Sequence, residues 1–335
     1  MENIEQKKTS FFDRKFRITE KGSSIKTEII AGLTTFLAMA YILVVNSGMF
    51  SALEGVSFDA MYVTTALSAV IGTVLIGLMA NLPLAQAPGM GLNAFFVYTV
   101  CFTLGFTYAN ALVFVLLDGL IFVILTVTGL RKIIFEAIPS AVKAAIPAGI
   151  GLFIAFLGLQ DAKLVIPDAS TGVTLASFNL FNGTTWDKVM PLIVAVISIL
   201  LIAVLSHKKI KGSILWGILG GTALYYLLGL TVPGFYNNFG DTFSFNPLKP
   251  FAAFGTETFG KVFTQGFDFS AYLAKDGNSV GGLVILFITT ALAFCMVDMF
   301  DTMGTLYGAC RGGNLLVEGK NDELEVPNMN KAMLA

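Results

Sequence analysis

Two aspartates, Asp298 and Asp301, lie three residues apart in an apolar stretch, residues 291–308, that is long enough to cross a lipid bilayer. An ionised carboxylate near the bilayer centre costs about 3 kcal/mol even on lenient insertion scales, so an acid there usually serves a function. On a helix this spacing puts both carboxylates on one face, beside Phe294 and Thr302. A purely structural role is the alternative, but the stretch holds no basic residue to pair with them.

The composition indicates the surroundings in which these acids must work. Of the 335 residues, 55% are hydrophobic and 13% are charged, against about 25% charged in ordinary soluble domains. The mean hydropathy is +0.77. These values predict an all-α polytopic membrane protein. A net charge of −1 gives no indication of a nucleic-acid partner.

The cysteines and the amino-terminal residues exclude further classes. All three cysteines lie in apolar stretches, without the spacing of a disulfide framework or a metal site. We therefore expect no metal and no cofactor. Residues 1–28 are charged and lack the apolar core of a secretory signal peptide, so we expect the first membrane span to direct insertion.

Apolar runs of about 17–25 residues predict eight membrane spans. They are 29–50, 60–80, 84–107, 110–130, 146–160, 189–206, 213–233 and 282–308. Residues 133–145 are amphipathic and predict an interfacial helix. This arrangement puts most of the 21 Lys and Arg residues on one side, which predicts a cell-membrane protein with both termini of the chain cytoplasmic. Residues 234–281 then form an extracytoplasmic loop.

The third span contains a second unusual stretch, PLAQAPGMGLNAFFVY. Pro88 disfavours helix at the residue before it, and Gly89 and Gly91 tolerate backbone angles that a helix does not use, so helix is expected only from about Leu92. In transporters such an interrupted span marks the substrate site, although a plain proline kink is the alternative. Asn93 follows the break directly and would offer an amide to a ligand.

Phe95, Asp118 and His207 are three further residues whose side chains could do chemistry. Phe95 would offer an aromatic face to a planar ligand. Asp118, in the fourth span, is a third acid in apolar surroundings, and both a structural role and proton handling stay open for it. His207 stands beside lysines at a span end and is expected to be a solvated loop residue.

An internal repeat is suggested by a shift of 255 residues. It aligns Thr34, Thr35, Leu37 and Ala38 with Thr289, Thr290, Leu292 and Ala293, and it places Asn46 on Asp301. A repeat of seven spans would invert the second copy relative to the first, as in many secondary transporters. The chain would then hold the first repeat and only the first span of the second, and we expect it to be truncated after the eighth span.

Four stretches carry a resemblance to a known family: EIIAGLTTFLAMAYILVVN, APGMGLNAFFVYTV, IPAGIGLFIAFLGLQ and VDMFDTMGTLYG. At these residues the sequence resembles the nucleobase:cation symporter family, in its AzgA-like branch of guanine, hypoxanthine and adenine permeases. The resemblance implies the uracil-permease-like fold of two inverted seven-span repeats. A core domain, residues 29–130 and 282–310, would move against a gate domain, residues 131–233, and residues 311–335 would be a cytoplasmic loop.

The resemblance also implies roles for individual residues. Asn93 belongs to the substrate motif of the third span, and Asp298 is expected to bind the base directly. Asp298 and Asp301 would couple transport to protons, and the family's tenth-span glutamate would lie beyond Ala335. The expected substrate-binding residues are Asn93, Ala94, Phe95, Phe294 and Asp298, and the expected helix break is at Pro88, Gly89 and Gly91.

The predicted function is import of a purine nucleobase by proton symport. The partners would be the base, the coupling proton and the lipid bilayer, and the resemblance is compatible with a homodimer. An anion exchanger of the same architecture and a non-transporting fragment are the alternatives. An intramembrane enzyme is disfavoured because the sole histidine lies in a loop and no metal cluster or nucleophile with its base is evident.

Overall fold

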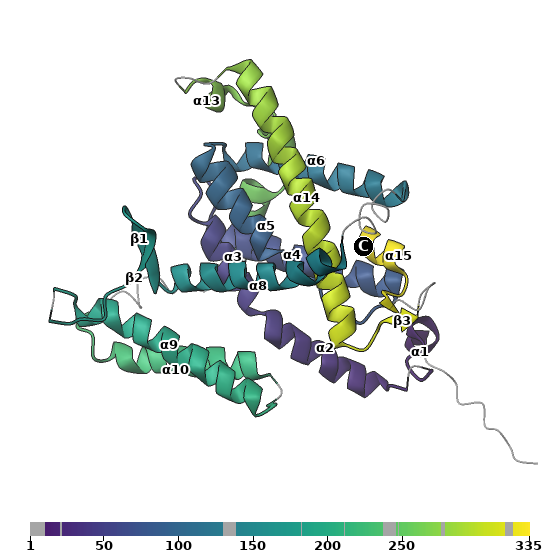
Figure 1. Cartoon of the computed structure of the whole chain (residues 1–335), viewed down its shortest axis with the longest axis horizontal. Coiled ribbons are helices and arrows are strands. Elements are labelled where there is room, and N and C mark those ends of the chain that lie inside the picture. Colours follow the sequence, from purple (N-terminus) through teal and green to yellow (C-terminus); the bar gives the residue numbers. More distant parts are fainter. Residues whose placement is uncertain are drawn as a thin grey trace, which may run out of the picture.

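A computed structural model of the chain is mostly helical (Figure 1). It describes residues 11–20, 22–129, 139–181, 183–210, 212–236, 246, 248–275, 279–318 and 324–335. A short helix, α1 (Phe11–Phe16), precedes the first long one.

Five helical stretches are long and apolar enough to cross a membrane. They are α2 (Ile25–Met39) with α3 (Tyr41–Phe50), α4 (Phe58–Leu75) with the π-helical η1 (Ile76–Ala80), α6 (Tyr108–Val127), α9 (Trp186–His207) and α14 (Val280–Gly312). Three shorter apolar helices complete the set: α5 (Met90–Ala94) with the π-helical η2 (Phe95–Thr103), the end of α8 (Ser140–Asp161), and α10 (Ser213–Gly229). Each predicted span overlaps one of these eight.

Hydroxyl side chains fix the start of four of these helices. Ser24, Ser57, Thr107 and Ser279 each accept a hydrogen bond from the backbone N–H three residues later. This bond satisfies one of the N–H groups that have no partner in the first turn. A polar cap therefore stands directly before each apolar run, which explains why these helices begin where they do.

The structure departs from the predicted elements in three places. The first span is divided at Ala40 into α2 and α3. Of the predicted interfacial helix, residues 133–145, the first six lie outside the described residues. Residues 140–145 belong to the continuous helix α8. Two short antiparallel hairpins accompany the helices: β1 (Val165–Asp168) with β2 (Gly172–Leu175), and β3 (Val317–Glu318) with β4 (Leu324–Glu325).

Helix α14 contributes to both hydrophobic cores. Its residues Ala291 and Phe294 belong to a cluster built around Phe114 of α6, here called the Phe114 cluster. Further along, Met299, Met303 and Leu306 belong to a second one, the Met303 cluster, together with Ile76 of η1 and residues of the terminal helix α15 (Met329–Leu334). Helices α9 and α10 pack on each other as an antiparallel pair away from α14 (Figure 1).

The segment before α14 is packed on the helix ends. It contains α11 (Lys249–Ala253), the π-helical η3 (Phe254–Thr258), α12 (Lys261–Thr264) and α13 (Ser270–Leu273). Asn110 Nδ2, at the start of α6, donates to the carbonyl oxygens of Gly266 and Asp268, both at 2.8 Å. The backbone N–H of Ser57 donates to Glu257 Oε2 at 2.8 Å. The predicted loop is therefore tied to the ends of α4 and α6.

Asn110→Ala tests this attachment. The Asn110 side chain is fully buried, so its removal leaves two carbonyl oxygens without their donor and should destabilise the chain by about 2–3 kcal/mol. A lower unfolding temperature of the purified chain in detergent measures the effect. Asn179→Ala, in an exposed loop, is the matched control and should change the unfolding temperature little. Equal unfolding temperatures for both variants would show that Asn110 does not hold the segment.

Candidate functional site

The third span is interrupted at the break predicted from Pro88 and the glycines that follow it. Residues 81–89 have no helical structure, and α5 begins at Met90, two residues before the expected start. Gly89 is extended, with φ −70° and ψ 113°, whereas Gly91 lies inside α5. Proline supplies no backbone N–H and restricts the residue before it, so Pro88 keeps the chain out of the helix until this point. A π-helix, η2, follows α5 directly, and such segments occur often at functional sites.

The Asp301 side chain of α14 approaches the backbone of Gly89. A Cβ atom on Gly89 would lie 2.9 Å from Asp301 Oδ2, closer than side-chain carbons are found in proteins. The Asp301 carboxylate thus rests against the chain just before the first turn of α5. The free N–H groups at this end of a helix favour a negative charge.

A second contact joins the same two elements further along. The rings of Phe95 and Phe294 meet edge to face with their centroids 5.0 Å apart. Gly89 beside Asp301 and Phe95 beside Phe294 show that the chain from Gly89 to Phe95 runs antiparallel to α14. Asn93 and Asp298 lie between these two contacts in their respective segments. The structure therefore brings the two stretches singled out in the sequence into contact.

Asn93 is held by a chain of side-chain hydrogen bonds. Its Nδ2 donates to Asn46 Oδ1 of α3 at 2.6 Å, and Asn46 Nδ2 donates to Thr65 Oγ1 of α4 at 2.8 Å. Asn46 and Thr65 are 3% and 1% exposed. Neither residue is predicted from the sequence to belong to the site, and Asn46 is aligned there only with Asp301 in the suggested repeat. A polar side chain inside an apolar span was the signal that could have identified it.

The two carboxylates differ in their immediate partners. Asp298 Oδ1 accepts a hydrogen bond of 3.2 Å from Thr302 Oγ1, one turn later on α14. Asp301 lies beside Gly89. Both side chains are half-buried. Carboxylates accept hydrogen bonds and cannot donate them, so the site suits a ligand that carries N–H groups.

Aromatic side chains form the apolar part of the site. Phe294 is 2% exposed, and its ring is nearly parallel to Phe114 at a centroid distance of 6.5 Å, so it belongs to the core as well as to the site. Phe95 is half-buried, and Ala94 is buried. Phe153 of α8 was not predicted, but its ring would lie 3.8 Å from a Cβ atom on Gly91. Asp118 is buried on α6.

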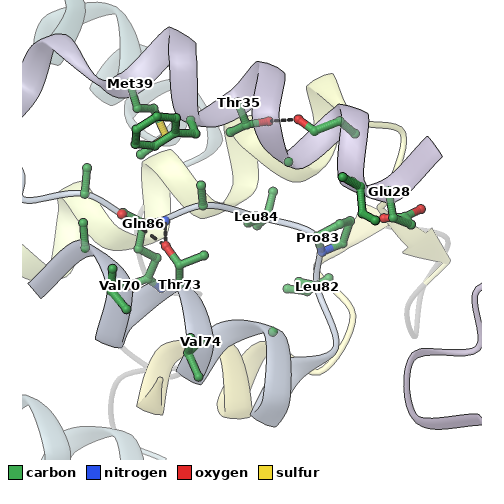
Figure 2. Close-up of a pocket in the computed structure, with 18 of the residues that line it drawn as sticks. Glu28, Thr35, Met39, Val70, Thr73, Val74, Leu82, Pro83, Leu84 and Gln86 are labelled. Atoms are coloured by element: carbon green, nitrogen blue, oxygen red, sulfur yellow. Dashed lines mark hydrogen bonds between the residues drawn. The ribbon is translucent and has the colours of Figure 1, made fainter. Parts of the chain in front are cut away.

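A cavity of about 860 Å³ flanks the same non-helical segment. Figure 2 shows it between α2, α4 and residues 82–86, with Glu28 near Pro83. Thr73 Oγ1 accepts from the backbone N–H of Gln86 at 2.9 Å and so fixes the segment against α4. The lining is mostly apolar and does not include Asn93, Asp298 or Asp301.

Comparison with known proteins assigns a family. A model described as the permease family matches residues 26–335. The guanine/hypoxanthine permeases PbuO and PbuG of Bacillus subtilis are 36% and 35% identical to the chain over 96% of its length. The adenine permease AdeP of Escherichia coli is 28% identical, also over 96% of the chain.

The chain spans 66% of the length of PbuO and of PbuG, and 63% of the length of AdeP, just under two thirds in each case. The family match covers all the apolar helices except the first residue of α2. It includes both segments that form the site. The chain is a multi-pass membrane protein, and it belongs to the permease family.

Proposed function

We propose that the chain binds a purine nucleobase between α5 and α14 and that the protein imports this base together with protons. A permease moves its substrate without converting it, so this activity is transport and not enzymatic catalysis. One observation carries the proposal. Residues 89–95 of the interrupted third span contact residues 294–301 of α14, and these two stretches carry one amide and two carboxylates but no basic residue. The relatives named for guanine, hypoxanthine and adenine transport agree with it.

The chemistry of a purine fits these groups. A neutral purine presents N–H donors and ring-nitrogen acceptors around a flat apolar ring. A carboxylate such as Asp298 can accept two adjacent N–H groups, and such charge-assisted hydrogen bonds are stronger than neutral ones. The half-buried Phe95 would contact the ring. Asn93 would address a further edge of the base.

Bound protons would neutralise the carboxylates of the site when the site moves during transport. The base is neutral and leaves the charge of the carboxylates in place when it binds. A carboxylate that moves through apolar surroundings is costly, and a bound proton removes its charge. We therefore assign proton coupling to Asp298 and Asp301, with Asp298 also contacting the base.

The same proposal extends to the architecture. We place residues 29–130 and 282–310 in a core domain and residues 131–233 in a gate domain of a fold with two inverted seven-span repeats. The packing supports a division, because α14 contacts α5 and α6 while α9 and α10 contact each other. Helix α8 touches both α5 and α14, as expected of a gate element that faces the site. Both termini of the chain would be cytoplasmic, and residues 234–281 would lie on the outer side.

Anion exchange is the competing function for this architecture. An anion would need a basic side chain or exposed helix ends at its binding site. The ionisable residues inside the predicted spans are the acids Asp118, Asp298 and Asp301. Bicarbonate or sulfate should therefore not compete with purines for the site.

Asp298→Asn should abolish accumulation of radiolabelled hypoxanthine in cells that lack purine transport. The amide keeps the shape of the side chain but cannot carry a proton or accept two donors with a full negative charge. Accumulation by the unaltered chain should be lost when a protonophore is added. Asp168→Asn, at the end of strand β1 and outside α5 and α14, is the control and should transport normally. Unchanged accumulation by Asp298→Asn, in cells where the chain reaches the membrane, would remove this residue from the mechanism.

Asp301→Asn should separate binding from coupling. We expect hypoxanthine affinity within about threefold of the unaltered chain, because Asp298 still accepts the N–H groups, together with a large loss of uptake rate. Equilibrium binding to membrane vesicles and initial uptake rates measure the two quantities. A loss of binding as great as that of Asp298→Asn would reverse the roles of the two acids.

Gly89→Ala should weaken hypoxanthine binding by about tenfold. The added methyl group would displace the Asp301 carboxylate, which lies 2.9 Å from the position of the new carbon, and with it the adjoining start of α5. Gly91→Ala is the matched control, because its methyl group would meet the Phe153 ring at an ordinary contact distance of 3.8 Å. Equal affinities in the two variants would mean that the contact between Gly89 and Asp301 has no part in binding.

A further inference from the structure

The segment before α14, residues 248–275, is fixed to the protein but leaves aromatic rings exposed. Besides the hydrogen bonds of Asn110 and Glu257 described above, the ring of Tyr272 stacks on that of Phe106 with the centroids 4.5 Å apart. The same segment carries four phenylalanines that are 59–72% exposed, here called the aromatic surface: Phe251, Phe259, Phe263 and Phe267. These rings therefore project from a backbone that is attached to the helices.

The charged side chains of the segment have partners within the chain. Lys249 Nζ lies 3.2 Å from Asp59 Oδ2 of α4, and Lys275 Nζ donates to the carbonyl oxygen of Gly105 at 2.9 Å. Glu257 Oε2 accepts from a backbone N–H at the start of α4. A loop that faces water ordinarily does the reverse, because it exposes its charges and buries its large apolar side chains. This pattern indicates that something other than water covers the aromatic surface.

The position of the segment indicates what covers it. Helices α4 and α6 are long and apolar enough to cross a membrane, and their starts are capped by Ser57 and Thr107. Glu257 is bonded to the backbone of Ser57, and the hydroxyl groups of Thr258 and Thr64 are 2.9 Å apart. Thr64 lies within the first two turns of α4. The segment is therefore beside the beginning of membrane-spanning helices, where lipid headgroups and acyl chains meet.

Helix α4 provides an apolar surface next to the segment. Both α11 and η3 pack on this helix. Further along, α4 exposes Leu67 and Ile71, which lie one turn apart on one face. In a multi-pass membrane protein such a face is suited to acyl chains. The aromatic surface thus adjoins a helix that itself exposes apolar side chains to the bilayer.

We propose that the aromatic surface anchors the protein in the membrane interface, with its phenylalanine rings inserted between headgroups and acyl chains. Interfacial segments bury their apolar side chains about 5–10 Å into this boundary. The partner is the lipid bilayer, and the inference does not depend on the purine site. Because the segment is bonded to α6, and α14 packs on α6, this anchor sets the depth of α14 in the membrane.

Tryptophan fluorescence in liposomes tests the anchor. The two native tryptophans are replaced (Trp186→Phe and Trp216→Phe), and Phe263→Trp then provides a single reporter on the aromatic surface. Phosphatidylcholine that carries bromine atoms either near the headgroup or near the end of the acyl chains quenches tryptophan at the matching depth. We expect the shallow bromines to quench Phe263→Trp about threefold more strongly than the deep ones. Leu67→Trp, about 14 Å along α4 from its start, should show the opposite preference.

Tyr272→Trp is the matched control, because this position belongs to the same segment but is buried against Phe106. Neither lipid should quench it appreciably. Phe259→Trp replaces Phe263→Trp if that protein is not monodisperse in detergent. An unquenched reporter on the aromatic surface would overturn the proposal. Emission at the wavelength of tryptophan in water would then mean that the surface is solvated, and emission at shorter wavelength would mean that protein covers it.

Discussion

The structure depends on a stretch of backbone, residues 81–89, that leaves the helix inside an apolar bundle. Polar backbone groups in such surroundings must find partners within the protein. Thr73 of α4 accepts from the N–H of Gln86, and Asn328 Nδ2 donates to the carbonyl oxygen of Ala80 at 3.1 Å. Asp301 of α14 approaches at Gly89. The Gln86 N–H and the Ala80 carbonyl oxygen therefore have partners inside the protein.

Helix α14 can hold two acids beside this stretch because it is anchored on both sides of them. Phe294 is fixed in the Phe114 cluster, and Met299 and Met303 are fixed in the Met303 cluster. Asp298 lies between Phe294 and Met299, and Asp301 lies between Met299 and Met303. The apolar contacts of these three residues fix the rotation and position of the helix. The free energy that keeps the carboxylates in place thus comes from the packing of large apolar side chains, and the acids themselves need not stabilise the fold.

Much of the architecture follows from the sequence because membrane spans are set by length and hydropathy, which are local properties. The eight apolar runs and the break at Pro88 are of this kind. The division of the first span at Ala40 was not predicted, since no proline or glycine stands there. Asn110 also gave no local sign of its role, because its partners, Gly266 and Asp268, lie more than 150 residues away along the chain. Contacts of this kind are decided by tertiary packing.

The candidate site shows the same division. Asp298, Asp301 and Asn93 could be identified one by one because each is a polar residue that an apolar span does not need. The contact between their two segments, at Phe95 with Phe294 and at Gly89 with Asp301, could not be predicted from either segment alone. The hydrogen bonds that join Asn93 to Asn46 and Asn46 to Thr65 run across three helices, and no spacing within one helix encodes them.

Determination of the structure with hypoxanthine bound would test the central claim most directly. We predict density for the base between α5 and α14, with a ring N–H within hydrogen-bond distance of the Asp298 carboxylate and another edge facing Asn93. Density for the base in the apolar cavity between α2 and α4 (Figure 2), with the contact of α5 and α14 closed and empty, would contradict the account.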